Sequence, residues 1–293
     1  MTIDFCVPYW GDPADLRATV ASVLHQTDDR WRLTVIDDCY PDASVPAFFA
    51  ELDDPRVTYR SNERNVGIVE NFRRAVAAAE GPYLVVLGSD DLLEPDYVRT
   101  MLRAAAEHPE ADVLQPGVRV VDASAVPVRT LVDFVKLRLL TPRRERSLAA
   151  QDMARSLLIG DWLYWPSLVF RTETIRRFDF RDDLPIILDL AILIDIAFSD
   201  GTLHYLPDVV FSYRRHAESA SQKTILDGTR FEDERAYYRE VAQRAGRRGG
   251  RRARRAARWR VMSRLHGLAV LPGVLRRGTP RARRAALALA FGV

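Results

Sequence analysis

The first 120 residues of the chain alternate short β-branched runs with amphipathic segments. This is the pattern expected of strands and helices in a largely parallel sheet. The pattern predicts strands at Ile3 to Val7, Leu33 to Asp37, Val57 to Arg60, Tyr83 to Leu87 and Asp112 to Gln115. We therefore expect an α/β fold with a mostly parallel sheet flanked by helices.

The remainder of the chain is less regular. The segment from about Val126 to Arg146 is irregular and basic, and we expect it to loop over the sheet. Beyond it the pattern predicts a helix at Met153 to Ile159, a strand at Ser167 to Arg171, an apolar helix at Ile186 to Phe198, and short strands at Leu203 to Tyr205 and Val209 to Tyr213. From Phe231 onward the pattern is helical but polar.

Positive charge is concentrated at the end of the chain. From Arg244 to the end there are 15 arginines and no acidic residue, so the preceding chain carries 28 of the 43 basic residues against all 40 acidic ones. Two adjacent glycines interrupt the run from Arg244 to Arg260, where we expect a hinge or mobile segment rather than core. For the whole tail we favour an amphipathic basic segment that rests on an anionic membrane surface. Disorder is the first alternative, and nucleic-acid binding is the weakest because no recognised motif accompanies the arginines.

The sequence also bears on location and redox state. No run reaches the roughly 18 to 20 apolar residues that cross a bilayer, and the best candidate, Ile186 to Phe198, is interrupted by Asp189 and Asp195. Without a secretory-signal pattern at the start, we expect a cytoplasmic protein, with peripheral attachment to the inner face of the membrane as an option.

Cys6 and Cys39 lie in or beside predicted buried strands, and we expect free thiols that behave as small apolar side chains.

Two pairs of aspartates follow predicted strands. Asp37-Asp38 closes one strand, and Asp90-Asp91 lies just beyond another. The carboxyl ends of parallel strands face the crevice where open α/β sheets bind ligands. Either pair alone could be a turn or a helix cap, but two pairs at strand ends favour a ligand site.

A divalent metal held by carboxylates suits one class of ligand. A nucleoside diphosphate builds negative charge as it leaves, and such a metal can neutralise that charge. Mg²⁺ and Mn²⁺ prefer oxygen ligands, and Asp91 is the first candidate. The chain has neither a P-loop nor a dinucleotide glycine motif, so phosphate binding would depend on metal and side chains.

Several segments follow one another in a definite order and spacing over residues 1–100. These segments are Val7-Pro8-Tyr9-Trp10, Ser22 to Thr27, Val35 to Asp42, Asn65-Val66-Gly67, Asn71, Gly81 and Leu87-Gly88-Ser89-Asp90-Asp91. Their order and spacing resemble the family-2 inverting glycosyltransferases, with weaker agreement to about residue 220. The resemblance implies a Rossmann-like GT-A fold, a nucleoside-diphosphate sugar donor, for which a UDP-sugar is the default, and Mn²⁺ or Mg²⁺ as cofactor.

Site residues follow from the same resemblance. It implies that the nucleotide-sugar is bound by Pro8, Tyr9, Asp37, Asp38, Asn65, Gly67, Asn71, Ser89, Asp90 and Arg214. Asp38 would contact the base with Asp37 as its support, while Asp90 would contact the ribose or a metal-bound water. Asp91 would bind the metal, and Gly88 stands where the family often has a further acid.

Asp189 is the candidate general base, which an inverting transfer needs to take the proton of the acceptor hydroxyl. It lies in an apolar segment where an uncompensated carboxylate is costly, and its position resembles the family's glutamate-aspartate catalytic pair, with Leu188 replacing the glutamate. A satisfied core acid or a helix cap is the alternative. Asp195 is a competitor that would point elsewhere on a helix.

Two later segments resemble ligand-binding regions. Phe211 to His216 is similar to the family's late tyrosine-arginine-any-histidine motif, in which His216 would reach the metal or the diphosphate; a structural histidine is equally consistent. Arg214 or Arg215 would touch phosphate. The aromatic stretch Gly160 to Pro166 could form an acceptor platform or simply pack in the core.

Together these features predict a main domain over residues 1–228 and a helical, arginine-rich extension over residues 229–293. The nucleotide-binding half would cover about residues 1–120, and the acceptor half about residues 121–228. We expect an inverting, metal-dependent transfer of sugar to a hydroxyl of a saccharide or lipid-linked acceptor, in the synthesis of cell-surface polysaccharide, glycolipid or glycoconjugate. The alternatives are an inactive nucleotide-sugar-binding scaffold and a sugar nucleotidyltransferase.

Overall fold

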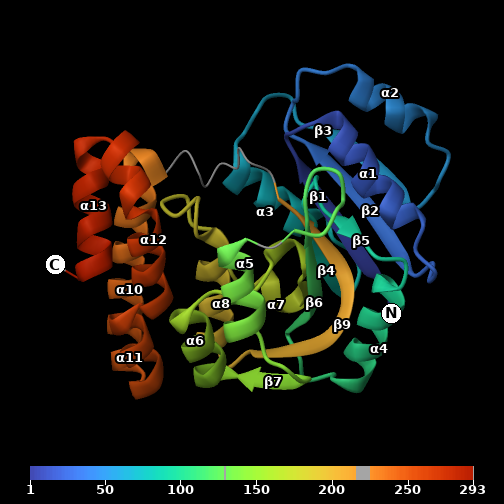
Figure 1. Ribbon diagram of the computed structural model, residues 1–293. Helices are drawn as coiled ribbons and strands as arrows, with labels where there is room; N and C mark the ends of the chain where they lie inside the picture. The colour runs from blue at the N-terminus through green and yellow to red at the C-terminus, as the bar shows by residue number, and fades with distance from the viewer. Residues whose placement is uncertain (129, 216–224, 293) are drawn as a thin grey trace.

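The computed structural model describes residues 1–128, 130–215 and 225–292, and within them a central sheet is flanked by helices (Figure 1). The strands are β1 (Ile3–Tyr9), β2 (Trp31–Asp37), β3 (Val57–Ser61), β4 (Tyr83–Val86), β5 (Leu92–Leu93), β6 (Val113–Val121), β7 (Arg146–Ala149), β8 (Val169–Arg171) and β9 (Thr202–Arg214). They lie in the order β3-β2-β1-β4-β8-β6-β9-β5, with β7 beside β9. The five strands predicted in the first 120 residues and the α/β fold are confirmed.

The first half of the sheet is parallel. β1 pairs in parallel with β2 and β4, and β2 pairs in parallel with β3. The connecting helices are α1 (Pro13–Leu24), α2 (Ser44–Glu51) and α3 (Ile68–Ala78). α1 begins where predicted, because the Asp12 side chain accepts a hydrogen bond from the Ala14 backbone N–H at 2.7 Å. Since these strands run the same way, the loops that follow β1, β2 and β4 share one edge of the sheet.

The second half of the sheet is mixed. β8 lies antiparallel between β4 and β6, while β9 is parallel to β6 and antiparallel to β5 and β7. β9 is one strand of 13 residues, so the prediction of two separate strands is wrong. The pairing of β9 with β6 shifts register at Pro207-Asp208, opposite Gly117. Gly117 permits this close approach, because a Cβ on Gly117 would lie 2.6 Å from the Pro207 carbonyl oxygen. β5 then holds the end of β9 beside the loop after β4.

Helices cover both faces of the sheet and enclose its core. They include α4 (Tyr97–Glu107), α6 (Ala150–Ile159), α7 (Thr172–Ile175) and α8 (Leu188–Phe198). α8 is buried on almost every side, as expected of a helix that is apolar all round. It packs with α6 on one side of the sheet, and this arrangement fixes the position of Asp189 at the start of α8.

The segment between β6 and β7 is more ordered than expected. It forms the short helix α5 (Leu131–Val135), followed by a π-helical turn over Lys136–Leu140. The Thr130 hydroxyl accepts a hydrogen bond from the Asp133 backbone N–H at 3.2 Å and so caps α5. The prediction of an irregular loop is wrong here, because this cap and the burial of Asp133 give the segment a fixed place.

The arginine-rich end of the chain is helical, as predicted. It forms α10 (Thr229–Arg247), α11 (Arg251–Trp259), α12 (Val261–Arg277) and α13 (Pro280–Phe291), which stack at one end of the molecule (Figure 1). Ala253, Ala256 and Ala257 of α11 are buried in the same apolar cluster as residues of α6 and α8. The expectation of a hinge outside the core is therefore wrong. Over the described residues, no helix combines the length and apolarity needed to span a bilayer.

The two cysteines differ in their surroundings. Cys6 is buried in β1, where burial raises the pKa of its thiol to about 12, so it behaves as the small apolar side chain expected. Cys39 is exposed and follows β2 at a φ of 63°, so the same expectation is wrong for Cys39. The chain turns there, and the thiol faces the Glu63 carbonyl oxygen at 3.9 Å.

Candidate functional site

The loop after β2 is organised by the Asp38 carboxylate, which is 2% exposed. Its oxygens accept hydrogen bonds from the Asn62 side chain at 2.9 Å and from the backbone N–H groups of Val66 at 2.8 Å and Gly67 at 2.9 Å. Three donors satisfy much of what a carboxylate can accept. Asp38 therefore fixes the shape of the chain over residues 62–67, beside the crevice.

Asp37 supports the same region from the other side. It is buried, and its carboxylate accepts hydrogen bonds from the Tyr40 backbone N–H at 2.7 Å and from the Tyr59 hydroxyl at 2.5 Å. These contacts tie the end of β2 to the following turn and to β3. Asp37 therefore stabilises the backbone next to Asp38.

Asn65, Gly67 and Asn71 belong to the same loop and to the helix that follows it. Gly67 starts α3 with a φ of 85°, a conformation that glycine adopts without the strain of a side chain. Asn71 is buried; it donates to the Ile36 carbonyl at 3.0 Å and accepts from Asn62 at 3.1 Å. Of the three, Asn65 is the exposed side chain at the crevice, whereas Asn71 holds the loop from beneath.

The loops after β1 and β4 meet at the same edge. Tyr9 is buried; its hydroxyl donates to the Gly11 carbonyl at 2.7 Å and its ring lies 5.4 Å from that of Tyr40. A Cβ on Gly11 would lie 3.7 Å from the Ser89 hydroxyl oxygen. Pro8 is half-buried near the end of β1. The predicted donor residues of β1, β2 and β4 are thus brought together.

The Asp91 carboxylate is almost completely buried in the loop after β4. It is 1% exposed, and one oxygen accepts a hydrogen bond from the Arg214 backbone N–H at 2.9 Å. The other oxygen has no hydrogen-bond partner among the described residues. Burial, together with the neighbouring charge of Asp90, raises the pKa of Asp91 well above its ordinary value. A buried carboxylate oxygen left unpaired is costly unless a ligand completes it.

Gly88 makes room for this carboxylate. A Cβ built on Gly88 would lie 2.4 Å from an Asp91 oxygen and 3.0 Å from an Asp90 oxygen. The two carboxylates therefore converge over the glycine, at the position where the related motif often carries another acid. Converging carboxylate oxygens fit a hard divalent cation.

The end of β9 completes this part of the site. The Arg214 guanidinium forms an ion pair with Asp15 of α1, while its backbone binds Asp91. Arg215 instead makes a two-pronged contact with Asp133, at 2.8 and 2.6 Å. The structure thus places both arginines on protein carboxylates. His216, the predicted metal or phosphate ligand, lies outside the described residues.

Asp189 lies in the first turn of α8, paired with a second acid. Its carboxylate accepts a hydrogen bond from the Leu190 backbone N–H at 2.8 Å. Burial, and next the charge of Asp161, raise the pKa of Asp189 to about 6, against a smaller opposing effect of Lys136 and Arg230. Burial also raises the pKa of Asp161. A carboxylate whose pKa approaches neutrality in this way suits a general base.

Sequence reasoning did not assign roles to several of these residues. Asp161 stands 28 positions before Asp189, so no local spacing links the two acids. Asp133 is buried and binds Arg215 and the Tyr164 hydroxyl, the latter at 3.0 Å. The available signal in the sequence was the position of Asp161 within the aromatic stretch Gly160 to Pro166. The competitor Asp195 is held in an ion pair with Arg244 of α10.

The aromatic stretch itself is part of the core. Trp162, Tyr164 and Trp165 are only 2%, 5% and 8% exposed. An acceptor platform needs exposed ring faces, so that alternative is wrong and the packing alternative holds. Trp10, which follows β1, is the exposed aromatic beside the crevice, at 51% exposure and edge-on to Tyr40.

Comparison with known proteins agrees with this architecture. The sequence model of glycosyl transferase family 2 matches residues 4–154, more than half of the chain. The succinoglycan biosynthesis protein ExoO of Rhizobium meliloti is 33% identical over 103 residues, which cover 35% of this chain and 29% of that protein. Glycosyltransferase GlyA of Streptococcus pneumoniae is 30% identical over 113 residues, which cover 38% of this chain and 16% of that protein. The chain thus spans a minor part of these relatives.

Solved structures show the same fold over a longer stretch. S. aureus TarS 1–349 in complex with UDP superposes with a TM-score of 0.65 at 15% identity, covering 100% of this chain and 92% of that one. The complex of TarS 1–349 with UDP-GlcNAc gives 0.64 at 16% identity, covering 82% and 66%. The GT-A fold is therefore confirmed. The chain belongs to glycosyl transferase family 2.

Proposed function

We propose that this protein transfers a sugar, with inversion, from a nucleoside-diphosphate donor to a hydroxyl acceptor. The observation that carries the proposal is the pair Asp90 and Asp91, which converge over Gly88 at the carboxyl edge of the parallel strands. One buried Asp91 oxygen has no hydrogen-bond partner over residues 1–128, 130–215 and 225–292. Asp91, together with Asp90, would hold a divalent cation here, and the cation would supply charge neutralisation for the diphosphate. Membership of the family supports the same chemistry.

The donor side is the loop edge after β1, β2 and β4. Asp38 shapes residues 62–67, and its position at the end of β2 supports recognition of the nucleotide base together with Pro8. Asn65, exposed in this loop, and Ser89, in the loop after β4, are polar side chains at the same edge. TarS binds UDP and UDP-GlcNAc, which supports a uridine donor as the first one to test.

Asp91, with Asp90, would hold Mn²⁺ or Mg²⁺. When bound, such a cation neutralises negative charge on the departing diphosphate. Arg214 supports Asp91 through its backbone N–H, and the ion pair of its guanidinium with Asp15 fixes the end of β9 against α1. These contacts keep the Asp91 carboxylate aimed over Gly88.

Asp189 would remove the proton from the acceptor hydroxyl. With a pKa of about 6 it is mostly ionised at neutral pH, yet basic enough to accept a proton during attack. Asp161 tunes it, because a second negative charge nearby disfavours ionisation of the first. The candidate base Asp189 and membership of the family both support inversion at the anomeric carbon.

We place the acceptor among saccharides or lipid-linked saccharides, in the synthesis of a cell-surface polysaccharide or glycoconjugate. The relative ExoO, named for succinoglycan biosynthesis, supports this choice. A cytoplasmic protein attached to an anionic membrane surface would meet such an acceptor. The structure offers a surface for that attachment on α11 and α12.

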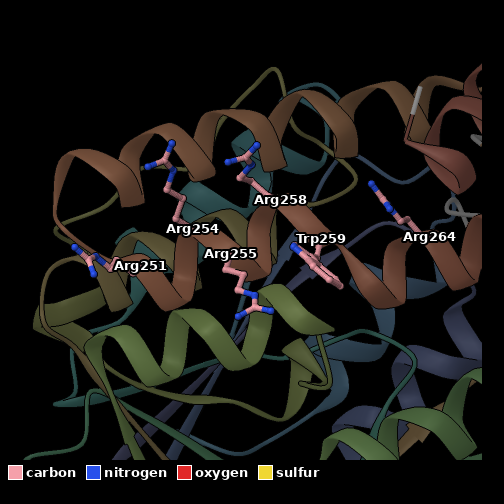
Figure 2. Close-up of a pocket in the computed structure, with 6 residues that line it drawn as sticks. All are labelled: Arg251, Arg254, Arg255, Arg258, Trp259 and Arg264. Atoms are coloured by element: carbon pink, nitrogen blue, oxygen red, sulfur yellow. The ribbon is translucent and has the colours of Figure 1, made fainter.

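This basic surface is shown in Figure 2, which draws the side chains that line a cavity of about 790 Å³. The lining residues are Arg251, Arg254, Arg255, Arg258, Trp259 and Arg264. Trp259 is 59% exposed, and Leu265 and Leu268 of the next helix are exposed as well. Among the described residues, Arg251, Arg254 and Arg258 have no ion pair with a carboxylate. Unpaired guanidinium groups beside exposed apolar side chains suit an anionic bilayer surface.

The test of donor binding is a thermal-shift panel of uridine, guanosine and thymidine diphospho-sugars, each with Mn²⁺ and with a chelator. Metal-dependent stabilisation by one nucleotide would support the proposal and name the donor base. Stabilisation by none would count against the roles of Asp38 and Asp91. Donor binding without hydrolysis or transfer would favour the inactive scaffold, and release of pyrophosphate a nucleotidyltransferase.

The membrane proposal is tested by co-sedimentation with vesicles of phosphatidylcholine, with and without phosphatidylglycerol. We expect binding to the anionic vesicles only, and its loss when Arg251, Arg254 and Arg258 are replaced by Gln. The matched control replaces three exposed arginines elsewhere, Arg143, Arg144 and Arg177. Equal loss in both triple variants would show that net charge alone, rather than this surface, is responsible.

A further inference from the structure

Two histidines and a glutamate gather at the end of the sheet opposite the donor site. His108 ends α4, Glu145 precedes β7, and His204 lies near the start of β9. One oxygen of Glu145 lies 3.2 Å from Nε2 of His108 and 3.0 Å from Nε2 of His204. The two imidazole rings are stacked, with centroids 3.6 Å apart. Three residues from distant parts of the sequence thus converge at one point.

The outer nitrogens of both rings also have partners. Nδ1 of His204 lies 2.8 Å from the Ser147 hydroxyl, and Nδ1 of His108 lies 3.4 Å from a Glu110 carboxylate oxygen. Histidines that bind a metal through one nitrogen usually engage a carboxylate, carbonyl or water with the other. Here both outer nitrogens are engaged, and both Nε2 atoms are directed at Glu145.

Two of the three spacings among the inner atoms match a tetrahedral cation, and all three atoms lie within 4.8 Å of one another. With metal–ligand distances of about 2.0 to 2.1 Å, two ligands of a tetrahedral zinc ion are about 3.3 Å apart. The two nitrogen–oxygen distances of 3.0 and 3.2 Å are close to this edge length. We propose that His108, Glu145 and His204 bind a divalent transition-metal ion such as Zn²⁺, with water at the fourth position.

A hydrogen-bonded trio explains these contacts less well. If both Nε2 atoms donate to Glu145, the contact of His108 with Glu110 requires a second proton on that ring. A metal ion would take the place of the Nε2 protons, so that neither ring needs a second proton. Because the rings are stacked, they would turn on binding so that each Nε2 lone pair points at the ion.

The site is separate from the donor site and would have a different role. His204 and Arg214 are ten positions apart on β9, up to about 33 Å along an extended strand. His204 is fixed on both sides, opposite Leu114 of β6 and Ser147 of β7. A metal would clamp the end of α4 and the start of the edge strand β7 onto β9. We infer a structural metal that stabilises this end of the sheet.

The experiment uses the full chain, stripped with a chelator and titrated with Zn²⁺ against a chromophoric zinc indicator. We expect one equivalent of zinc to bind with micromolar or tighter affinity and to raise the melting temperature. Replacing the exposed ligand, Glu145→Gln, or the half-buried one, His108→Gln, should weaken binding at least about tenfold. His25→Gln, an exposed histidine outside the cluster, should leave it unchanged.

Asp91→Asn separates this site from the donor site. Retention of the zinc equivalent in Asp91→Asn, together with its loss in Glu145→Gln and His108→Gln, would support the proposal whatever the outcome for sugar transfer. Loss of the equivalent in Asp91→Asn alone would assign the ion to the donor site and overturn it. A wild-type protein that binds no zinc, or variants that bind it as tightly as wild type, would also overturn it.

Discussion

Asp38, in the loop after β2, and Asp91, in the loop after β4, are both buried carboxylates that follow a parallel strand, at 2% and 1% exposure. Their surroundings differ. Asp38 accepts hydrogen bonds from three N–H groups, whereas the Asp91 side chain accepts one, and its other oxygen has no partner within the part of the chain that the structure describes. The first is stabilised by the protein alone, and the second is left for a ligand to complete. A buried carboxylate whose hydrogen bonds are all made by the protein gives the site its shape. A buried carboxylate oxygen without a hydrogen-bond donor indicates where a ligand binds.

The strongest test of this difference is Asp91→Asn. We expect sugar transfer to fall by at least about a thousandfold, because the substitution removes the carboxylate that would hold the cation, and the cation neutralises the developing negative charge. Thermal stability should stay the same or rise, since the substitution removes a poorly solvated charge. Activity with the cognate donor and a melting curve measure both effects. A variant that keeps wild-type turnover would end the assignment of Asp91 as the metal ligand.

Asp38→Asn should behave in the opposite way. An amide group in place of one oxygen faces a backbone N–H, so a hydrogen bond to a charged group is lost, at a cost of about 2 kcal/mol in the free energy of unfolding. Donor affinity should fall as the loop over residues 62–67 loosens. Urea denaturation measures the first effect, with the exposed neighbour Glu63→Gln as control. Unchanged stability would contradict the organising role of Asp38.

The sequence was sufficient to predict the strands and the sheet edge that form the site, but not the difference between the surroundings of Asp38 and Asp91. Alternating runs predicted β1 to β4, and the aspartates at two strand ends identified the edge where ligands bind. Whether a carboxylate is satisfied depends on residues such as Asn62 and Arg214, which are distant in sequence. The pairing of Asp161 with Asp189 could not be predicted for the same reason, since packing of α8 brings the two acids together.

The local sequence pattern also gave wrong predictions of secondary structure and order where contacts with distant segments decide the structure. The arginine-rich run was expected to be a hinge, but three alanines spaced along α11 bury one face against α6. The pattern predicted two short strands on either side of Pro207, yet Gly117 opposite it allows the pairing of β9 to continue. In each case the deciding contact comes from a different segment of the chain.

A third test concerns the pair Asp161 and Asp189. Because burial and Asp161 raise the pKa of Asp189 to about 6, kcat/KM should rise with pH around a midpoint near 6. Asp161→Asn removes a like charge and should move that midpoint to lower pH, while Asp189→Asn should be inactive throughout. The pH profile of kcat/KM measures the shift. A shift caused instead by Asp195→Asn would contradict the pairing.

The smallest effect is expected from Gly88→Ala, which leaves every carboxylate in place but removes the space in which two of them converge. The added Cβ would lie 2.4 Å from an Asp91 oxygen, a distance that real contacts do not allow, so the carboxylates of Asp90 and Asp91 must move apart. The Mn²⁺ concentration for half-maximal activity should rise about tenfold, in the range seen when groups around a metal are disturbed. Turnover at saturating metal should change less. Gly273→Ala, where a Cβ meets nothing within 4 Å, is the matched control. If Gly88→Ala required no more Mn²⁺ than the control, the open space over Gly88 would not be the cation position, and Asp91 would need another reason for its unpaired oxygen.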